Sequence, residues 1–331
     1  MRMREEENEQ NEAQALLIKH AESRGGKPKR LISLDVFRGL AVAIMILVDD
    51  AGGVLPAINH SPWNGVTIAD FVMPFFLFIV GVSLGLVYKE VSNKVVASRK
   101  AILRALKLSI LGIVLQGGYF HKLNDLTFGV NIENIRWLGI LQRIALGYFI
   151  AAVCEIWLTS DTVVDSLEGL LKKYRIQWLL AISLSAVYLA LLYGIYVPDW
   201  KFEVQITNSS NTSSSITYTV KCGVRGNLGP ACNAVGMVDR SVLGIKHLYQ
   251  NPSYRRLKEC TVDSPTYAPT WCQAPFDPEG LLSSIMAAVT CLIGLHFGHI
   301  LVHFQACKER LSHCTISSLG LIFFGGALCI L

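Results

Sequence analysis

Apolar runs of about twenty residues recur along this chain and constrain its fold more than any other feature, because a helix of that length crosses a hydrocarbon core of roughly 30 Å. Backbone groups in lipid must be hydrogen-bonded internally, which favours helices. We identify seven candidate spans: residues 34–55, 66–88, 101–118, 137–158, 177–197, 281–304 and 314–331. Since 52% of the residues are hydrophobic and only 17% are charged, the sequence predicts an all-α, polytopic transmembrane helix bundle.

Basic residues between the spans predict how the chain is oriented. They are Lys27, Lys29, Arg30, Lys89, Lys94, Arg99, Lys100, Arg104, Lys172, Lys173, Arg175, Lys308 and Arg310. If the seven spans alternate in direction, all of these lie on one side, as the positive-inside rule requires of cytosolic loops. Residues 1–30 are polar and lack the apolar core of a signal peptide, so we expect a cytosolic tail followed by a membrane domain, residues 31–331.

The long connection between the fifth and sixth spans, residues 198–280, then falls on the lumenal side. Its composition agrees, because it contains two N-glycosylation sequons, at Asn208 and Asn211. It also contains four cysteines, namely Cys222, Cys232, Cys260 and Cys272. In an oxidising compartment we expect these to form two disulfides, although four cysteines allow three connectivities.

The first span contains charges that a simple membrane anchor would not carry. Each unpaired charge near the bilayer centre costs about 2.5 to 3.5 kcal/mol, so we interpret Asp35, Arg38, Asp49 and Asp50 as functional candidates. Asp35 and Arg38 are three residues apart, so they share one face of a helix. We expect Asp35 to line a site there and Arg38 to bind an anionic group of a cofactor. The alternative is a cytosolic cap in which Arg38 reaches the interface.

A polar, turn-rich stretch, residues 59–65 (Asn-His-Ser-Pro-Trp-Asn-Gly), follows the first span. An imidazole works as acid or base near neutral pH without large tuning, so His60 is the expected catalytic base. Asp49 is expected to orient the imidazole, as a carboxylate does in hydrolytic triads. Asn64, or backbone amides of the loop, is expected to hold a developing oxyanion.

Asp70 and Trp63 are expected to line the same site. Asp70 lies one turn into the second span, where a carboxylate suits the positive end of the helix dipole. Capping of that helix is an equally good explanation of Asp70.

The fourth span opens with the polar residues Gln142 and Arg143. Because a guanidinium matches phosphate oxygens bidentately, Arg143 and Gln142 are candidate cofactor-binding residues. The alternative is that Arg143 pairs with Glu155 or with an acid of the first span.

Three histidines, His296, His299 and His303, lie on one stripe of the sixth span. No carboxylate or cysteine completes a metal-binding set, so we expect no metal and interpret the stripe as a polar face toward other helices. The sequence contains no signature of nucleic-acid binding.

Several blocks, in order, resemble the heparan-α-glucosaminide N-acetyltransferase family. They are residues 30–40, 59–81, 139–143, 238–250 and 276–281, and the resemblance extends over residues 30–304. It implies a multi-span enzyme that transfers an acetyl group from cytosolic acetyl-CoA to the amine of a terminal glucosamine of a lumenal glycan. It also implies that His60 is the catalytic residue and that Arg143 is essential.

The chain departs from the family pattern in three ways. It lacks the lumenal domain and the extra span that precede the first block in animal members, it has Asp49 where they have asparagine, and it ends before their C-terminal spans. We therefore expect a truncated member in an endomembrane, a lysosome or vacuole, with lipid and a glycan or small-molecule acceptor as partners. A homo-oligomer of this chain is a further possible partner.

Two alternatives to an acetyltransferase remain at the level of sequence. In a proton-coupled transporter, Asp35, Asp49, Asp50 and Asp70 would form a relay. In an inactive truncated isoform, the remaining spans would bind full-length partners.

Overall fold

The structure, a computed structural model, describes residues 31–55, 57–89, 91, 93–116, 135–159, 164, 166–207, 213–261 and 268–330. The chain divides into two compact units, Met1–Leu40 and Ala41–Leu331. The boundary falls within helix α2 (Ile32–Ala51), so the first half of α2 is described by itself. Asn208 and Asn211, the predicted glycosylation sites, lie outside the described residues.

Helices occupy the positions of the seven predicted spans. After α2 come α3 (Ile68–Val87), α4 (Lys94–Gln116), α5 (Ile140–Leu158), the short α6 (Leu167–Lys173), α7 (Arg175–Gly194), α9 (Leu281–His303) and α10 (Cys307–Ile330). Within the described residues, 4 of them, α3, α5, α7 and α9, are long and apolar enough to cross a membrane by length and composition. Helices α2 and α4 carry more charged residues than these candidate spans. The structure therefore supports a membrane helix bundle but does not confirm seven spans.

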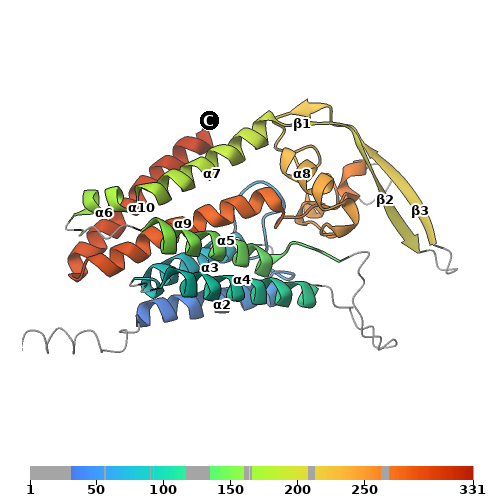
Figure 1. Ribbon diagram of the computed structural model, residues 1–331. Helices are drawn as coiled ribbons and strands as arrows, with labels where there is room; N and C mark the ends of the chain where they lie inside the picture. Colours follow the sequence, from blue (N-terminus) through green and yellow to red (C-terminus); the bar gives the residue numbers. More distant parts are fainter. Residues whose placement is uncertain are drawn as a thin grey trace, which may run out of the picture. The chain divides into compact units, whose positions relative to one another are not determined.

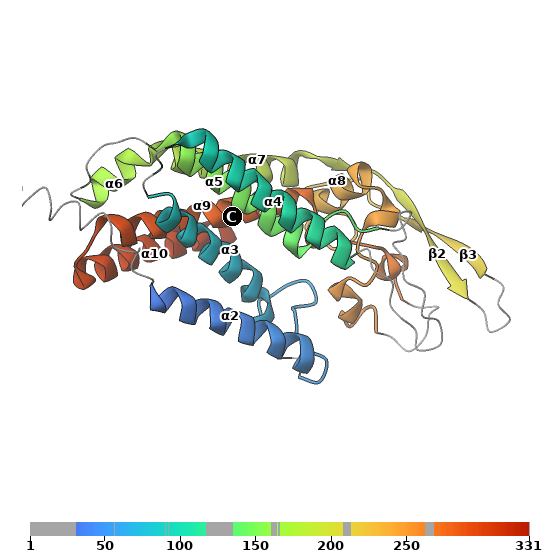
Figure 2. The ribbon, with the colours of Figure 1, turned by 60° about the horizontal axis from the view of Figure 1, so that its bottom comes forward.

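Helix α9 is the centre of the helical part. It contacts α3, α5 and α7, and Figure 1 shows it between α7 on one side and α3 and α5 on the other. Figure 2 shows α4 along α5, in agreement with their many contacts. Fully buried Ala151, Ala288, Cys291 and Leu295 form part of this core. An apolar helix so enclosed by other helices is typical of the interior of a membrane bundle.

Small residues let α3 and α9 approach closely. Gly81 and Gly85 on α3 face Gly294 and Gly298 on α9, and each pair is spaced by four residues. A methyl group on Gly81 would overlap the carbonyl oxygen of Cys291, and one on Gly294 would overlap that of Phe78. In a membrane the hydrophobic effect does not drive helices together, because lipid tails are as apolar as the helices. Pairs of small residues favour association by letting the two backbones come into contact.

A connecting region, residues 195–280, folds between α7 and α9. It contains β1 (Tyr196–Val197), β2 (Trp200–Thr207), β3 (Ser213–Val220), β4 (Val224–Arg225), α8 (Ala234–Val242) and the 3₁₀ turns η2 (Ile245–His247), η3 (Ser253–Arg256) and η4 (Thr270–Gln273). Strands β2 and β3 pair antiparallel, as do β1 and β4. Figure 1 shows the β2–β3 hairpin beyond α8, away from the helices of the bundle.

The connecting region has its own small core and two disulfides. Phe202, Val220, Ala231 and Ala274 are buried together. The disulfides join Cys222 to Cys232 and Cys260 to Cys272, which confirms two bridges and selects one of the three connectivities. Each bridge closes a short loop and so stabilises a region with few buried apolar residues.

Candidate active site

The loop before α3 places His60 against Asp70. The His60 Nδ1 atom lies 2.8 Å from Asp70 Oδ1, and the His60 side chain is 54% exposed. Because a carboxylate only accepts hydrogen bonds, the proton lies on Nδ1 and the Nε2 lone pair is left for chemistry. The pair has the base and orienting group of a hydrolytic triad.

Asp70 also starts the helix on which it lies. Its second carboxylate oxygen accepts hydrogen bonds from the Thr67 backbone N–H at 3.0 Å and the Thr67 hydroxyl at 3.1 Å. It accepts a third from the Ser61 N–H at 3.2 Å. Both explanations of Asp70 therefore hold at once, because one oxygen caps α3 and the other orients the imidazole.

Asp49, the residue expected to orient His60, does not take that position. It is exposed on α2, and among the described residues we find no hydrogen bond to its side chain. In the structure, the carboxylate next to His60 is that of Asp70, which was predicted to line the site or to cap the helix. Asn64 is exposed, and its backbone carbonyl accepts a hydrogen bond from the Ser61 hydroxyl at 2.6 Å.

The connecting region holds the His60 loop at three points. Arg256 donates to the His60 carbonyl at 2.8 Å, and Ser253 donates to the Pro62 carbonyl at 3.3 Å. The Trp63 indole donates to the Leu228 carbonyl at 2.8 Å. These bonds hold the loop at His60 and at two of the residues that follow it.

The Trp63 ring is also packed by aromatic residues of the connecting region. It meets Tyr254 and Phe276 edge to face, with ring centroids 6.0 Å and 5.2 Å apart. Aromatic pairs in this arrangement are worth about 0.5 to 1.5 kcal/mol beyond their buried area. Sequence reasoning placed Trp63 at the site but missed Arg256, Ser253 and Tyr254, since no motif links them to the loop.

A second cluster ties the segment before α5 to the segment before α9. Arg136 forms ion pairs with Asp277 and Glu279, and its Nε atom donates to Asp277 at 2.8 Å. These carboxylates raise the pKa of Arg136 despite its burial, so the guanidinium stays charged. His247 Nδ1 lies 2.6 Å from the Ile135 carbonyl.

Gln142 and Arg143 lie in the first turn of α5, at the end of the bundle where α3 and α9 also begin. Arg143 donates to the Ser283 carbonyl at 3.3 Å, in the first turn of α9. Its Nε atom and both amide atoms of Gln142 are buried and have no hydrogen-bond partner among the described residues. These atoms are the candidates for ligand binding at this position.

Glu155 pairs with His299 rather than with Arg143. The Glu155 carboxylate lies 2.9 Å from His299 Nε2 and accepts a bond of 2.9 Å from Gln177. Tyr174 stacks on the His299 ring at 3.5 Å. The histidines of the stripe are thus engaged with different helices, and among the described residues we find no group of three ligands for a metal ion.

In the first unit, Arg38 and Asp35 lie close together as their spacing suggests. Their charged atoms are 3.4 Å apart, and both side chains are partly exposed. The pair is consistent with the helical face predicted for them, while their roles toward a cofactor stay predictions.

The chain is similar to known proteins over most of its length. A family model described as the catalytic domain of heparan-alpha-glucosaminide N-acetyltransferase matches residues 30–198, which include His60, Asp70 and Arg143. The chain is similar to the heparan-alpha-glucosaminide N-acetyltransferase of Mus musculus, with 31% identity over 300 residues. It is 30% identical to that of Homo sapiens over 295 residues.

These matches cover most of this chain but a smaller part of the relatives. They include 86% of the chain against the mouse protein and 84% against the human one. The chain spans 41% and 40%, respectively, of the length of these relatives. A catalytic-family match over half of the sequence, with a histidine–carboxylate pair inside it, shows that the chain belongs to the heparan-alpha-glucosaminide N-acetyltransferase family.

Proposed function

We propose that this protein transfers an acetyl group from acetyl-CoA to the amine of a terminal glucosamine on a glycan. The observation that carries the proposal is the His60–Asp70 pair, an exposed imidazole whose Nδ1 atom lies 2.8 Å from Asp70 Oδ1. The name shared by the two relatives supplies the acceptor and the reaction. The pair supplies the base that such a reaction requires.

The amine nitrogen of the acceptor attacks the thioester carbonyl, and His60 Nε2 takes the proton that this nitrogen loses. The new C–N bond forms, the C–S bond breaks, and the proton passes from the imidazole to the departing CoA thiolate. Asp70 keeps the imidazole in the right tautomer and stabilises the imidazolium that forms in between. In the alternative, Nε2 attacks the thioester carbonyl, the C–S bond breaks and CoA leaves as the thiolate. The amine then attacks the acetyl-imidazole, the bond from the acetyl carbon to Nε2 breaks, and the amine proton passes to the thiolate.

The arrangement of the chain supports a lumenal acceptor. His60 lies beside the disulfide-containing connecting region, and disulfides persist in oxidising compartments. The basic residues between α3 and α4 and around α6 lie at the end of the bundle opposite to the His60 loop, as expected for a cytosolic face. We place the acceptor glycan on the His60 side and the N-terminal tail in the cytosol.

Labelled acetyl-CoA and glucosamine, incubated with membranes that contain the full chain, test the proposal. We expect His60→Ala to lower acetyl transfer by about 10² to 10⁴-fold, the usual contribution of a general acid–base residue. His247→Ala is the matched control, because His247 lies in the same region but bonds only a backbone carbonyl. Undiminished transfer by His60→Ala would exclude the mechanism.

The same labelled donor separates the two routes. Without acceptor, the covalent route predicts label on the protein that His60→Ala abolishes, and direct transfer predicts none. Transfer by an extended chain but not by these 331 residues would assign activity to a longer protein.

A further inference from the structure

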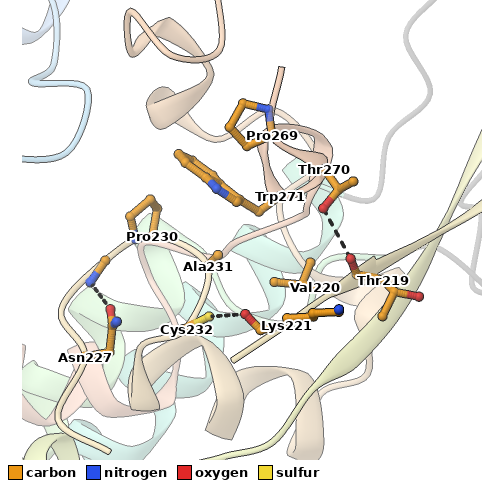
Figure 3. A pocket seen from close by; sticks show the side chains of 11 residues that line it. Thr219, Val220, Lys221, Asn227, Pro230, Ala231, Cys232, Pro269, Thr270 and Trp271 are labelled. Atoms are coloured by element: carbon orange, nitrogen blue, oxygen red, sulfur yellow. Dashed lines mark hydrogen bonds between the residues drawn. The ribbon is translucent and has the colours of Figure 1, made fainter. Parts of the chain in front are cut away.

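The connecting region contains a groove that the catalytic pair does not use. The groove has a volume of about 610 Å³ and is lined by residues 219–221, 227, 229–232 and 269–271. In Figure 3 the rings of Trp271, Pro230 and Pro269 gather on one side, and Lys221 and Thr219 lie on the other. A groove of this size is in the range of ligand sites, about 300 to 1,000 Å³.

The groove is joined directly to the His60 loop. Leu228, whose carbonyl accepts the Trp63 indole N–H at 2.8 Å, lies between the lining residues Asn227 and Gly229. A second connection passes through Tyr254, whose ring contacts both Trp271 at 5.9 Å and Trp63 at 6.0 Å. Both contacts place the groove next to residues that hold the His60 loop.

The lining has the chemistry of a sugar-binding surface. A pyranose has a face of C–H groups that packs on the negative face of an indole, and Trp271 is partly exposed for such stacking. Hydroxyl and amide groups of Thr270, Thr219 and Asn227 surround it and match sugar hydroxyls. Lys221 is exposed, and it is the charged residue among those that line the groove. The groove therefore favours an acidic sugar unit.

The position of the groove disfavours the donor. Cys232, one of its lining residues, is disulfide-bonded to Cys222, so the groove belongs to an oxidising compartment rather than the cytosol.

We propose that this groove binds the inner, acidic part of an oligosaccharide acceptor while the terminal sugar lies at His60. The proposal rests on the proposed acetyl transfer for the identity of the reaction, but binding in the groove requires no donor. The full chain would therefore bind a tetrasaccharide of alternating glucosamine and uronic acid better than glucosamine alone, and this preference would depend on Trp271 and Lys221.

Calorimetry on the detergent-solubilised full chain, without acetyl-CoA, tests binding of this tetrasaccharide. We expect Trp271→Ala to weaken it about ten-fold. Lys221→Gln, an exposed change that leaves the fold intact, should weaken it about three-fold and reduce its salt dependence. Tyr196→Ala and Lys201→Gln, exposed residues outside the groove, are the matched controls and should stay within about two-fold of the unchanged chain.

Trp271→Ala should lower acetyl transfer to the tetrasaccharide about ten-fold more than acetyl transfer to glucosamine, because the terminal sugar does not reach the groove. Unchanged tetrasaccharide binding in both groove variants would overturn the proposal, as would equal losses with both acceptors. Displacement of the tetrasaccharide by CoA would assign the groove to the donor instead. Retained binding without any acetyl transfer would refute the proposed function and leave the groove in place.

Discussion

The imidazole of His60 depends on one carboxylate for its orientation, and that carboxylate also begins a helix. Asp70→Asn keeps an oxygen that can accept from Nδ1 but adds a donor that can favour the other tautomer. We expect kcat for acetyl transfer to fall by about 10² to 10⁴-fold with little change in KM, by analogy with removal of the orienting charge in a triad. Steady-state kinetics over a range of acceptor concentrations measures this split.

The control for this variant must remove the cap without removing the orienting oxygen. Thr67→Ala loses the hydroxyl bond to Asp70 Oδ2 but leaves the bond from His60 to Oδ1. It should cost about 1 kcal/mol of stability, the usual value of a helix cap, with near-normal kcat. Equal losses of kcat in both variants would mean that Asp70 acts only through the helix.

Asp239 predicts a pH dependence of stability. This side chain is fully buried, and burial raises its pKa to about 6, although the Leu281 N–H and Arg240 favour the charged form. A carboxyl group whose pKa is raised on folding opposes folding when ionised. Its cost is therefore greatest above pH 6 and disappears as the pH falls toward 4.

Asp239→Asn should remove this component. We expect the wild-type chain to gain up to about 3 kcal/mol relative to Asp239→Asn between pH 7 and pH 4. Thermal unfolding of both proteins at several pH values checks it, and Glu259→Gln serves as the exposed control. A difference in stability that is independent of pH would contradict this assignment.

The residues of the site show what sequence reasoning reaches and what it does not. His60 was predicted because an imidazole works as acid or base near neutral pH, and because polar residues surround it in the sequence. Its partner was not, because Asp49 and Asp70 are at similar distances from it along the chain, and the turn decides between them. That turn includes Gly65 at φ 100, a conformation that favours glycine, and it leads back to Asp70 at the start of α3.

At the scale of elements, the close contact of α3 with α9 supports the site, since Asp70 lies in the first turn of α3 and Arg143 bonds a carbonyl in the first turn of α9. Gly81→Leu should disrupt this contact, because even a methyl group there would overlap the Cys291 carbonyl. We expect a loss of about 1 to 3 kcal/mol, the usual range for overpacking in a tight core. Thermal unfolding in detergent measures it.

Gly320→Leu on α10 is the matched control for this change. Nothing lies within 4 Å of the position that its β-carbon would occupy, so the substitution should be tolerated. Similar unfolding temperatures for the two leucine variants would show that α3 and α9 do not need this close contact.

The helices were predictable from sequence, but their pairing was not. An apolar run of about twenty residues indicates a helix, and each of the seven runs contains one within the described residues. The glycine spacing on α3 and α9 is visible in the sequence, yet spacing alone does not say which two helices meet. The connecting region was predicted as a disulfide-containing loop, while its hairpin and α8 were not.

At the scale of the whole molecule, distant segments build the site. The His60 loop is held by residues near positions 228 and 255, and Arg136 joins the start of α5 to residues just before α9. No single stretch of sequence contains this arrangement. The connecting region is therefore a part of the site and not an insertion between spans.

The proposed direction of the chain across the membrane can be measured. Cys307 is exposed at the start of α10, next to the basic residues expected in the cytosol, and forms no disulfide. A membrane-impermeant maleimide added to sealed vesicles with their cytosolic face outward should label Cys307, and Cys307→Ser should remove the label. Lys201→Cys, on β2, should be labelled only after the vesicles are opened. Labelling of both positions from the same side would place the His60 loop in the compartment of the basic loops, and the acceptor would then have to be cytosolic.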